Sequence, residues 1–232
     1  MTERLPDVMT EQEWRAFIGT FNTKCPTGLR NAAMFTLMHD AGLRVGEVIG
    51  LKTTDIVRDE LEGEPITCLH LRETKGDRHR VVYLTAEAEE LLQRWLEEKR
   101  RLGLGRRRHV FTTLKGAPVK DSYLREVAAR KGREAGITWR VHPHALRHTF
   151  ATELLEETGD LALVQEALGH RDPKTTRIYA RVRNSRLAAA MTRRRRDEEQ
   201  KREKAEEVAA KLLEQLPDEV RQALAEIVGR ET

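Results

Sequence analysis

Three short segments in the last third of the chain carry residue types that could act together on a phosphate ester. They are residues 144–148 (HALRH), residues 168–170 (LGH) and a tyrosine, Tyr179, nine positions after the second segment. An arginine guanidinium binds two phosphate oxygens with its fork of donors. A histidine carries protons near neutral pH, and a tyrosine that loses its proton is a nucleophile. Together these groups would be sufficient to cut a phosphodiester without a metal ion.

An upstream segment, residues 41–47 (AGLRVGE), adds a second arginine, Arg44. Two guanidinium groups on one phosphate would neutralise the charge that builds up in a pentavalent transition state. In mutagenesis, one preorganised donor of this kind is worth about 3–4 kcal/mol. Taken singly, Arg44 and Arg147 have an ordinary alternative, because the chain contains 42 lysines and arginines and most such side chains face solvent. Only their combination with the other segments favours a catalytic role.

The candidate nucleophile, Tyr179, needs partners because a tyrosine hydroxyl has an ordinary pKa of about 10. His144 lies three residues before Arg147 and therefore shares one face of a predicted helix with it. His170 closes a predicted short helix, from which a turn could bring it to the same phosphate. A structural role is the ordinary alternative for any single histidine. We prefer that alternative for His79, His109 and His148.

Lys75 is a further candidate because of its place in a predicted β-hairpin. Residues 66–71 and 79–84 have the composition of strands, and residues 74–77 have that of a connecting turn. The sequence therefore predicts a small antiparallel sheet with Lys75 at the tip of one hairpin. A lysine at such a tip is ordinarily solvated. Its functional alternative is a general acid that protonates a leaving oxygen, with a pKa lowered by nearby arginines.

The remaining elements that must position these residues are predicted to be helices. A capping box at Thr10 and Glu13 starts the first helix, and Gly42 suits a left-handed cap after the second. Helices are predicted at residues 28–40, after Arg44, after Thr85, at residues 121–134, after Pro143, after Asp160 and, carrying Tyr179, after Pro173. In the helix after Pro143 the inward face is expected to hold Leu146, Phe150, Ala151, Leu154 and Leu155.

The composition narrows the class of protein without identifying it. The chain has 232 residues and a formal charge of +4, which favours a polyanionic partner but is also compatible with ordinary solvated lysines and arginines. Two cysteines are too few for a disulfide framework, and neither stands in a metal-ligand spacing. The sequence also shows no secretory signal and no apolar run of about 20 residues. We therefore expect a cytoplasmic protein.

Read jointly, the segments resemble the tyrosine recombinase (phage integrase) family from about residue 5 to residue 182. The resemblance implies an α+β fold, mainly helical with a small antiparallel β-sheet, forming a catalytic domain over residues 1–191. It also implies site-specific DNA recombination through a 3′-phosphotyrosyl intermediate, on double-stranded DNA, with no cofactor and no metal. Integration, excision and inversion, as in mobile elements, remain open outcomes.

The resemblance implies a role for each matching residue. Arg44 and Arg147 would bind the scissile phosphate, and Glu47 would position Arg44. The remaining roles are Lys75 as general acid, His144 as an aid to proton movement, His170 as support for the transition state and Tyr179 as the nucleophile.

The sequence departs from the family's usual pattern at both ends. The N-terminal core-binding domain of most members is expected to be absent, so the chain is either a natural minimal recombinase or a domain of a longer protein. The charged tail, residues 192–232, is expected to be helical. Its amphipathic part, residues 217–228, packs either on its own body or on a second copy in a dimer or tetramer on DNA. Two rival functions are DNA relaxation of the type IB topoisomerase kind and DNA-binding regulation without efficient turnover.

Overall fold

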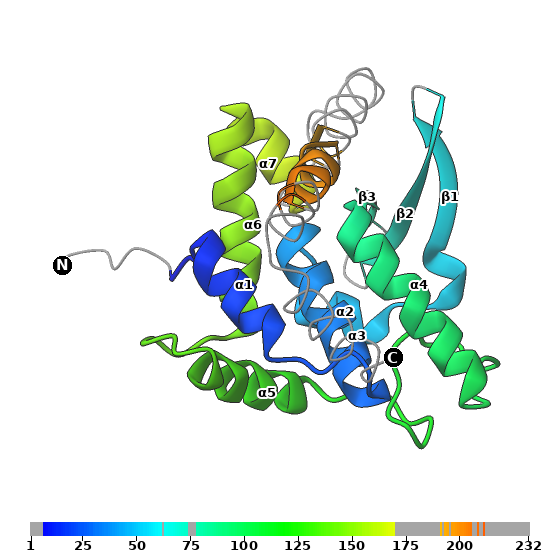
Figure 1. Cartoon of the computed structure of the whole chain (residues 1–232). Coiled ribbons are helices and arrows are strands. Elements are labelled where there is room, and N and C mark those ends of the chain that lie inside the picture. Colours follow the sequence, from blue (N-terminus) through cyan, green and yellow to red (C-terminus); the bar gives the residue numbers. More distant parts are fainter. Residues whose placement is uncertain are drawn as a thin grey trace. The chain divides into compact units, whose positions relative to one another are not determined.

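The computed structural model describes residues 7–61, 63–73, 78–169, 191, 193, 194, 196–205, 208 and 211. Contacts divide the chain into a first unit, residues 1–192, and a second unit, residues 193–232. The helices and strands of the first unit are α1 (Glu11–Gly19), α2 (Pro26–Asp40), α3 (Val45–Gly50), the 3-10 helix η1 (Thr53–Asp55), β1 (Ile56–Leu61), β2 (Glu64–Glu73), β3 (Arg78–Tyr83), α4 (Ala86–Arg101), α5 (Asp121–Glu134), α6 (Pro143–Thr158) and α7 (Leu161–Ala167) (Figure 1). The predicted class, mainly helical with a small antiparallel sheet, is confirmed.

The first helix begins where the sequence predicts. The Thr10 hydroxyl accepts from the backbone N–H of Glu13, and the Glu13 carboxylate accepts from the backbone N–H of Thr10. This capping box satisfies two donors that the first turn would otherwise leave without partners. The helix packs on α2 through Trp14, whose ring stacks on His39 with centroids 3.8 Å apart. The buried His39 in turn lies 2.6 Å from the carboxylate of Asp40.

Helix α2 is the centre of the first unit, since it packs against both α4 and α6 (Figure 1). The chain leaves it through Gly42, which has φ +62°. Glycine is required here for two reasons. A positive φ is costly for other residues, and a Cβ at this position would come within 2.4 Å of the Phe150 ring on α6. This close approach brings the start of α3 next to α6.

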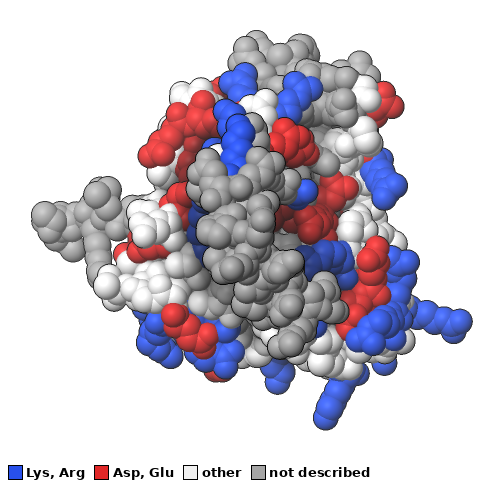
Figure 2. Space-filling model, in the orientation of Figure 1, with Lys and Arg blue, Asp and Glu red and all other residues white. Residues whose placement is uncertain are grey.

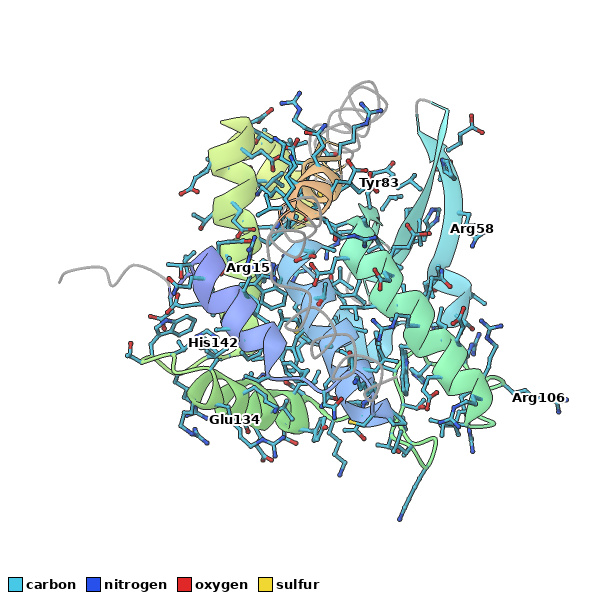
Figure 3. The ribbon with its side chains drawn as sticks, viewed as in Figure 1. Arg15, Arg58, Tyr83, Arg106, Glu134 and His142 are labelled. Atoms are coloured by element: carbon cyan, nitrogen blue, oxygen red, sulfur yellow. The ribbon has the colours of Figure 1, made fainter. Side chains whose placement is uncertain are left out.

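The sheet has the order β1-β2-β3, with both pairs antiparallel. β2 and β3 are the two predicted strands, and β1 is an additional strand that the sequence analysis missed. β1 is an edge strand that carries exposed charged residues at Arg58, Asp59 and Glu60, and Figure 3 shows Arg58 projecting from it. Charges on an edge strand hinder pairing with other chains. They also break the alternation of apolar and polar residues by which strands are recognised.

Both faces of the sheet are covered. On one face Leu69, Leu71 and Val82 join the main core, which includes buried residues of α1 to α5. On the other face Cys68 and Tyr83 pack in a smaller core with residues of α6 and α7. The smaller core includes Ile66, Phe150, Leu154, Leu163, Val164, Ala167 and Met191.

Helix α6 departs from prediction at one position. Leu146, Phe150 and Leu154 are buried, as their spacing predicts. Leu155, however, is 38% exposed, so the expectation that it faces inward is wrong. The buried side of α6 is broad up to Phe150, but after it only Leu154 is buried, and Leu155 lies one position beyond Leu154 on the turned-away side. Gly159, with φ +64°, ends the helix in the left-handed conformation.

Basic side chains are prominent where α4 ends and the following loop begins. Figure 2 shows Lys and Arg side chains at the lower right of the molecule, and in the same view Arg106 projects outward from the loop (Figure 3). The exposed arginines of this region are Arg94, Arg100, Arg101, Arg106, Arg107 and Arg108. Beneath them the buried Lys99 donates to the backbone oxygens of Arg107 and His109 at 2.9 and 2.6 Å. The amine of Lys99 thereby supports the basic loop from inside.

The second unit is helical at all of its described positions, which lie between residues 193 and 211. One ion pair within it joins Arg194 to Glu198 at 3.6 Å, four residues along the helix. The amphipathic stretch at residues 217–228 lies outside the described residues.

Candidate active site

Arg44 is the residue immediately before α3, so it stands at the N-terminal end of that helix. Its backbone N–H donates to Oε2 of Glu47 at 2.6 Å, and its Nη1 donates to Oε1 of the same carboxylate at 3.0 Å. The side chain of Arg44 is 33% exposed, whereas that of Glu47 is 15% exposed. Glu47 therefore caps the helix and holds the Arg44 guanidinium while leaving it at the surface.

Arg147 is held mainly by backbone carbonyl groups. Its side chain is 8% exposed, and its Nη1 and Nη2 donate to the backbone oxygens of Gly42 and Leu168, both at 2.5 Å. Nη1 also lies 3.9 Å from Oε2 of Glu47. The guanidinium thus joins α6 to the turn before α3 and to the C-terminal end of α7.

One carboxylate, that of Glu47, therefore brings together the two arginines that the sequence analysis proposed as a pair. It also binds a third arginine that the sequence analysis did not select. Nη2 of Arg80, on β3, donates to Oε2 of Glu47 at 2.7 Å, and the Arg80 side chain is only 9% exposed. A signal for Arg80 was present in the sequence. Arg80 and Val82 are two residues apart in β3 and therefore lie on the same face of the strand, which Val82 places toward the core. An arginine on the buried face of a strand requires a partner.

The histidines at the start of α6 lie close together. His142 is the N-cap residue, and its Nδ1 accepts from the backbone N–H of Ala145 at 3.2 Å. Its ring centroid lies 6.5 Å from that of His144, which is exposed. His148 follows His144 by four residues, one turn along the same helix. A structural role was expected for His148, and its pKa is affected by the charge of Arg147.

The electrostatics of this turn disfavour additional positive charge. Loss of hydration lowers the pKa of His148, and the charges of His144 and Arg147 lower that pKa further. Loss of hydration likewise lowers the pKa of His142, where Asp7 acts in the opposite direction and His144 and His148 add to the lowering. A neutral histidine beside an arginine is able to accept a proton.

The three other predicted site residues, Lys75, His170 and Tyr179, lie outside the described residues. For Lys75 and His170, residues close by in the chain are described. Lys75 falls between the end of β2 and the start of β3, and His170 follows Leu168, whose carbonyl binds Arg147, by two residues. Their roles stay predictions.

Within the described ranges no group of three or more histidine, cysteine, aspartate or glutamate side chains could hold a metal ion. Cys25 and Cys68 are unpaired thiols. Among the described residues no helix is both long enough and apolar enough to cross a membrane.

Comparison with known proteins identifies the family. The sequence matches the Phage integrase family over residues 7–186. This chain belongs to the phage integrase family. Two curated members are similar to it. The tyrosine recombinase XerD of Ralstonia nicotianae is 36% identical over 186 residues, covering 79% of this chain and 58% of the relative. The tyrosine recombinase XerC of Bacillus pumilus is 36% identical, covering 78% of this chain and 58% of the relative.

Solved structures of phage integrase family recombinases share the fold. The site-specific recombinase XerH, in a post-cleavage complex with a palindromic difH substrate, has a TM-score of 0.63 and 31% identity, covering 81% of this chain and 53% of XerH. The recombinase XerA has a TM-score of 0.61 and 30% identity, covering 83% of this chain and 66% of XerA. The present chain thus spans little more than half the length of the curated relatives that it matches.

Proposed function

We propose that this chain is the catalytic part of a site-specific DNA recombinase that cleaves and rejoins DNA through a 3′-phosphotyrosyl bond. The observation that carries the proposal is the convergence of Arg44 and Arg147 on Glu47. These two arginines come from opposite halves of the sequence, and a single carboxylate fixes one and lies beside the other. Together they are placed to bind one phosphate and to stabilise its transition state. The named relatives are recombinases, and XerH is described in a complex with its DNA substrate.

In the proposed reaction the Tyr179 oxygen attacks the scissile phosphorus, and the bond from phosphorus to the 5′ oxygen breaks. Lys75 donates a proton to that leaving oxygen, while His144 aids removal of the proton from the tyrosine hydroxyl. His170 supports the charged transition state alongside the arginines. The products are a phosphotyrosyl bond and a free 5′ hydroxyl. Attack by a 5′ hydroxyl of another strand reverses each step, so the energy of the phosphodiester is conserved and no cofactor is consumed.

The proposed partner is double-stranded DNA in the cytoplasm, with a second copy of this chain bound beside the first. The first unit is the proposed catalytic domain. For the second unit we propose a role in self-association, because the apolar residues of the amphipathic stretch 217–228 need another apolar surface to pack against. DNA affinity is expected to fall steeply with salt, since phosphate contacts release counterions.

The test is a duplex nicked close to the cleavage position, so that the short strand departs and the covalent product accumulates. Because the target sequence must first be found, a pool of randomised duplexes serves as the starting substrate. We expect a covalent protein–DNA band with the wild type and no band with Tyr179→Phe. A band that persists with Tyr179→Phe would assign the nucleophile to another residue. DNA binding by the wild type without any band would favour a regulator.

A second assay separates strand exchange from DNA relaxation. Two duplexes of different length, each carrying the target, are incubated with the protein, and recombinant lengths are measured. We expect recombinants. Relaxation of a supercoiled plasmid without recombinants would instead indicate a topoisomerase activity.

A further inference from the structure

The third arginine at Glu47 has no role in the reaction described above. Arg80 reaches Glu47 from β3, while Arg44 and Glu47 belong to α3 and its cap and Arg147 to α6. Oε2 of Glu47 accepts from Arg80 Nη2 at 2.7 Å and from the Arg44 backbone N–H at 2.6 Å. Arg80 is thus a close charged neighbour of a largely buried carboxylate.

The negative charge of Glu47 acts against the positive charges of Arg44 and Arg147. Arg44 and Arg147 are useful to a bound phosphate only while their positive charge acts on it. A negative carboxylate 3.0 Å from one guanidinium and 3.9 Å from the other reduces that charge. The reduction is large because charges interact more strongly at a site with little solvent than in bulk water, which screens them. Glu47 would therefore orient the arginines at the expense of their attraction for phosphate.

We propose that Arg80 is a positioning residue that neutralises Glu47. With Arg80 in place, the carboxylate orients Arg44 and lies beside Arg147 without cancelling their combined charge. The three arginines and the one glutamate then leave two positive charges for the phosphate. This inference rests on the proposed function, because it assigns the arginine pair to the scissile phosphate.

A purely structural role for Arg80 makes a different prediction. If Arg80 only ties the sheet to α3, its loss lowers the stability of the protein and reduces the cleavage rate of every substrate by the same factor. If Arg80 compensates the charge of Glu47, its loss reduces the cleavage rate of a charged phosphate more than that of a neutral one. The two roles are separated by a substrate in which a methyl group replaces one non-bridging oxygen of the scissile phosphate, since this methylphosphonate carries no negative charge.

The experiment measures single-turnover formation of the covalent complex on both substrates. With Arg80→Gln we expect the rate to fall about 100-fold on the phosphate and several-fold at most on the methylphosphonate. Arg80→Lys, which keeps the charge, is expected to recover most of the phosphate rate. The matched control is Arg30→Gln, which removes another buried arginine. Arg30 bonds to the Thr112 carbonyl and the Tyr123 hydroxyl and makes no contact with Glu47. This control should change both rates by the same factor.

A double-mutant cycle on the ordinary phosphate provides a second measurement. Once Glu47→Gln has removed the negative charge, adding Arg80→Gln should cost less than about 10-fold, a strongly non-additive result. The double variant leaves no glutamate charge to compensate, so it keeps the test available if Arg80→Gln alone fails to fold.

Equal losses on the two substrates together with additive effects in the cycle would overturn the role of Arg80, as would full activity of Arg80→Gln. In each case the covalent band of the wild type would leave the proposed function intact. A wild type that forms no band on either substrate would instead remove the proposed function, and this inference with it.

Discussion

Nη2 of Arg147 lies 2.5 Å from the backbone oxygen of Leu168, at the C-terminal end of α7. The partner of Nη1, the Gly42 carbonyl, is also part of the backbone. The guanidinium is therefore oriented by two main-chain groups, whose positions depend on how α6, α7 and the turn before α3 pack together. Any change in that packing moves the arginine.

Arg147→Lys should lose most of the activity although it preserves the charge. An ammonium group cannot reach both carbonyls in the planar geometry of a guanidinium. We expect covalent complex formation to fall by about 10²–10³-fold and unfolding free energy by about 1–3 kcal/mol, because a buried carbonyl loses its donor. Single-turnover assays and urea unfolding measure the two effects. Arg125→Lys, at an exposed residue of α5, is the control and should change neither.

Gly42→Ala should destabilise the protein more than an ordinary glycine substitution at positive φ. The left-handed conformation alone costs about 1–2 kcal/mol for other residues. At Gly42 the added Cβ would also press on Phe150 at 2.4 Å. Gly136→Ala is the matched control, since Gly136 has φ +75° and its Cβ would meet nothing within 4 Å. Thermal unfolding should show a larger loss for Gly42→Ala, partly relieved by Phe150→Leu. Equal losses at both glycines would contradict the steric contribution.

The histidines of α6 should make the protein less stable in mild acid. The pKa of His148 and that of His142 are lowered in the folded state, so the unfolded chain binds protons first as the pH falls below about 6.5. Their contribution is therefore unchanged above that pH and becomes destabilising as the pH falls from it toward the folded pKa values. Urea unfolding between pH 7 and pH 5 should show this loss, and His148→Gln should reduce it. His70→Gln, on an exposed residue of β2, serves as the comparison.

The two cysteines should differ sharply in reactivity. Burial, together with the nearby charge of Asp59, raises the pKa of the Cys68 thiol to about 11, whereas Cys25 is exposed. Because the thiolate is the reactive form, iodoacetamide at pH 8 should label Cys25 in the native protein and leave Cys68 unlabelled until denaturant is added. Peptide mass spectrometry distinguishes the two sites. Equal labelling without denaturant would show that the smaller core opens readily.

Removal of the second unit tests its proposed role in self-association. We expect the full chain to sediment as an oligomer in the presence of target DNA and residues 1–192 to bind the same DNA as a monomer. Circular dichroism of the shortened chain checks that the first unit stays folded. If both forms assemble equally, the interface between copies belongs to the first unit.

Local signals explain why much of the fold could be predicted. The Thr10 capping box and the cap at Thr85 join groups three residues apart, and the buried apolar residues of α5 recur every three or four positions. Each of these signals is therefore visible in the sequence itself. The polar edge strand β1 could not be predicted in this way. Its pairing with β2 is decided by hydrogen bonds between backbones, and these do not depend on the charged side chains that it carries.

For the site, the sequence by itself determined the kinds of groups and their order along the chain, including Arg44 at a helix start and His144 one turn from Arg147. Only the tertiary structure decided that Glu47 is shared by three arginines and that Arg147 is held by two carbonyls. The physical reason is distance along the chain. Helix caps join near neighbours, whereas the Glu47 cluster joins three elements, and their relative placement results from packing of the whole first unit.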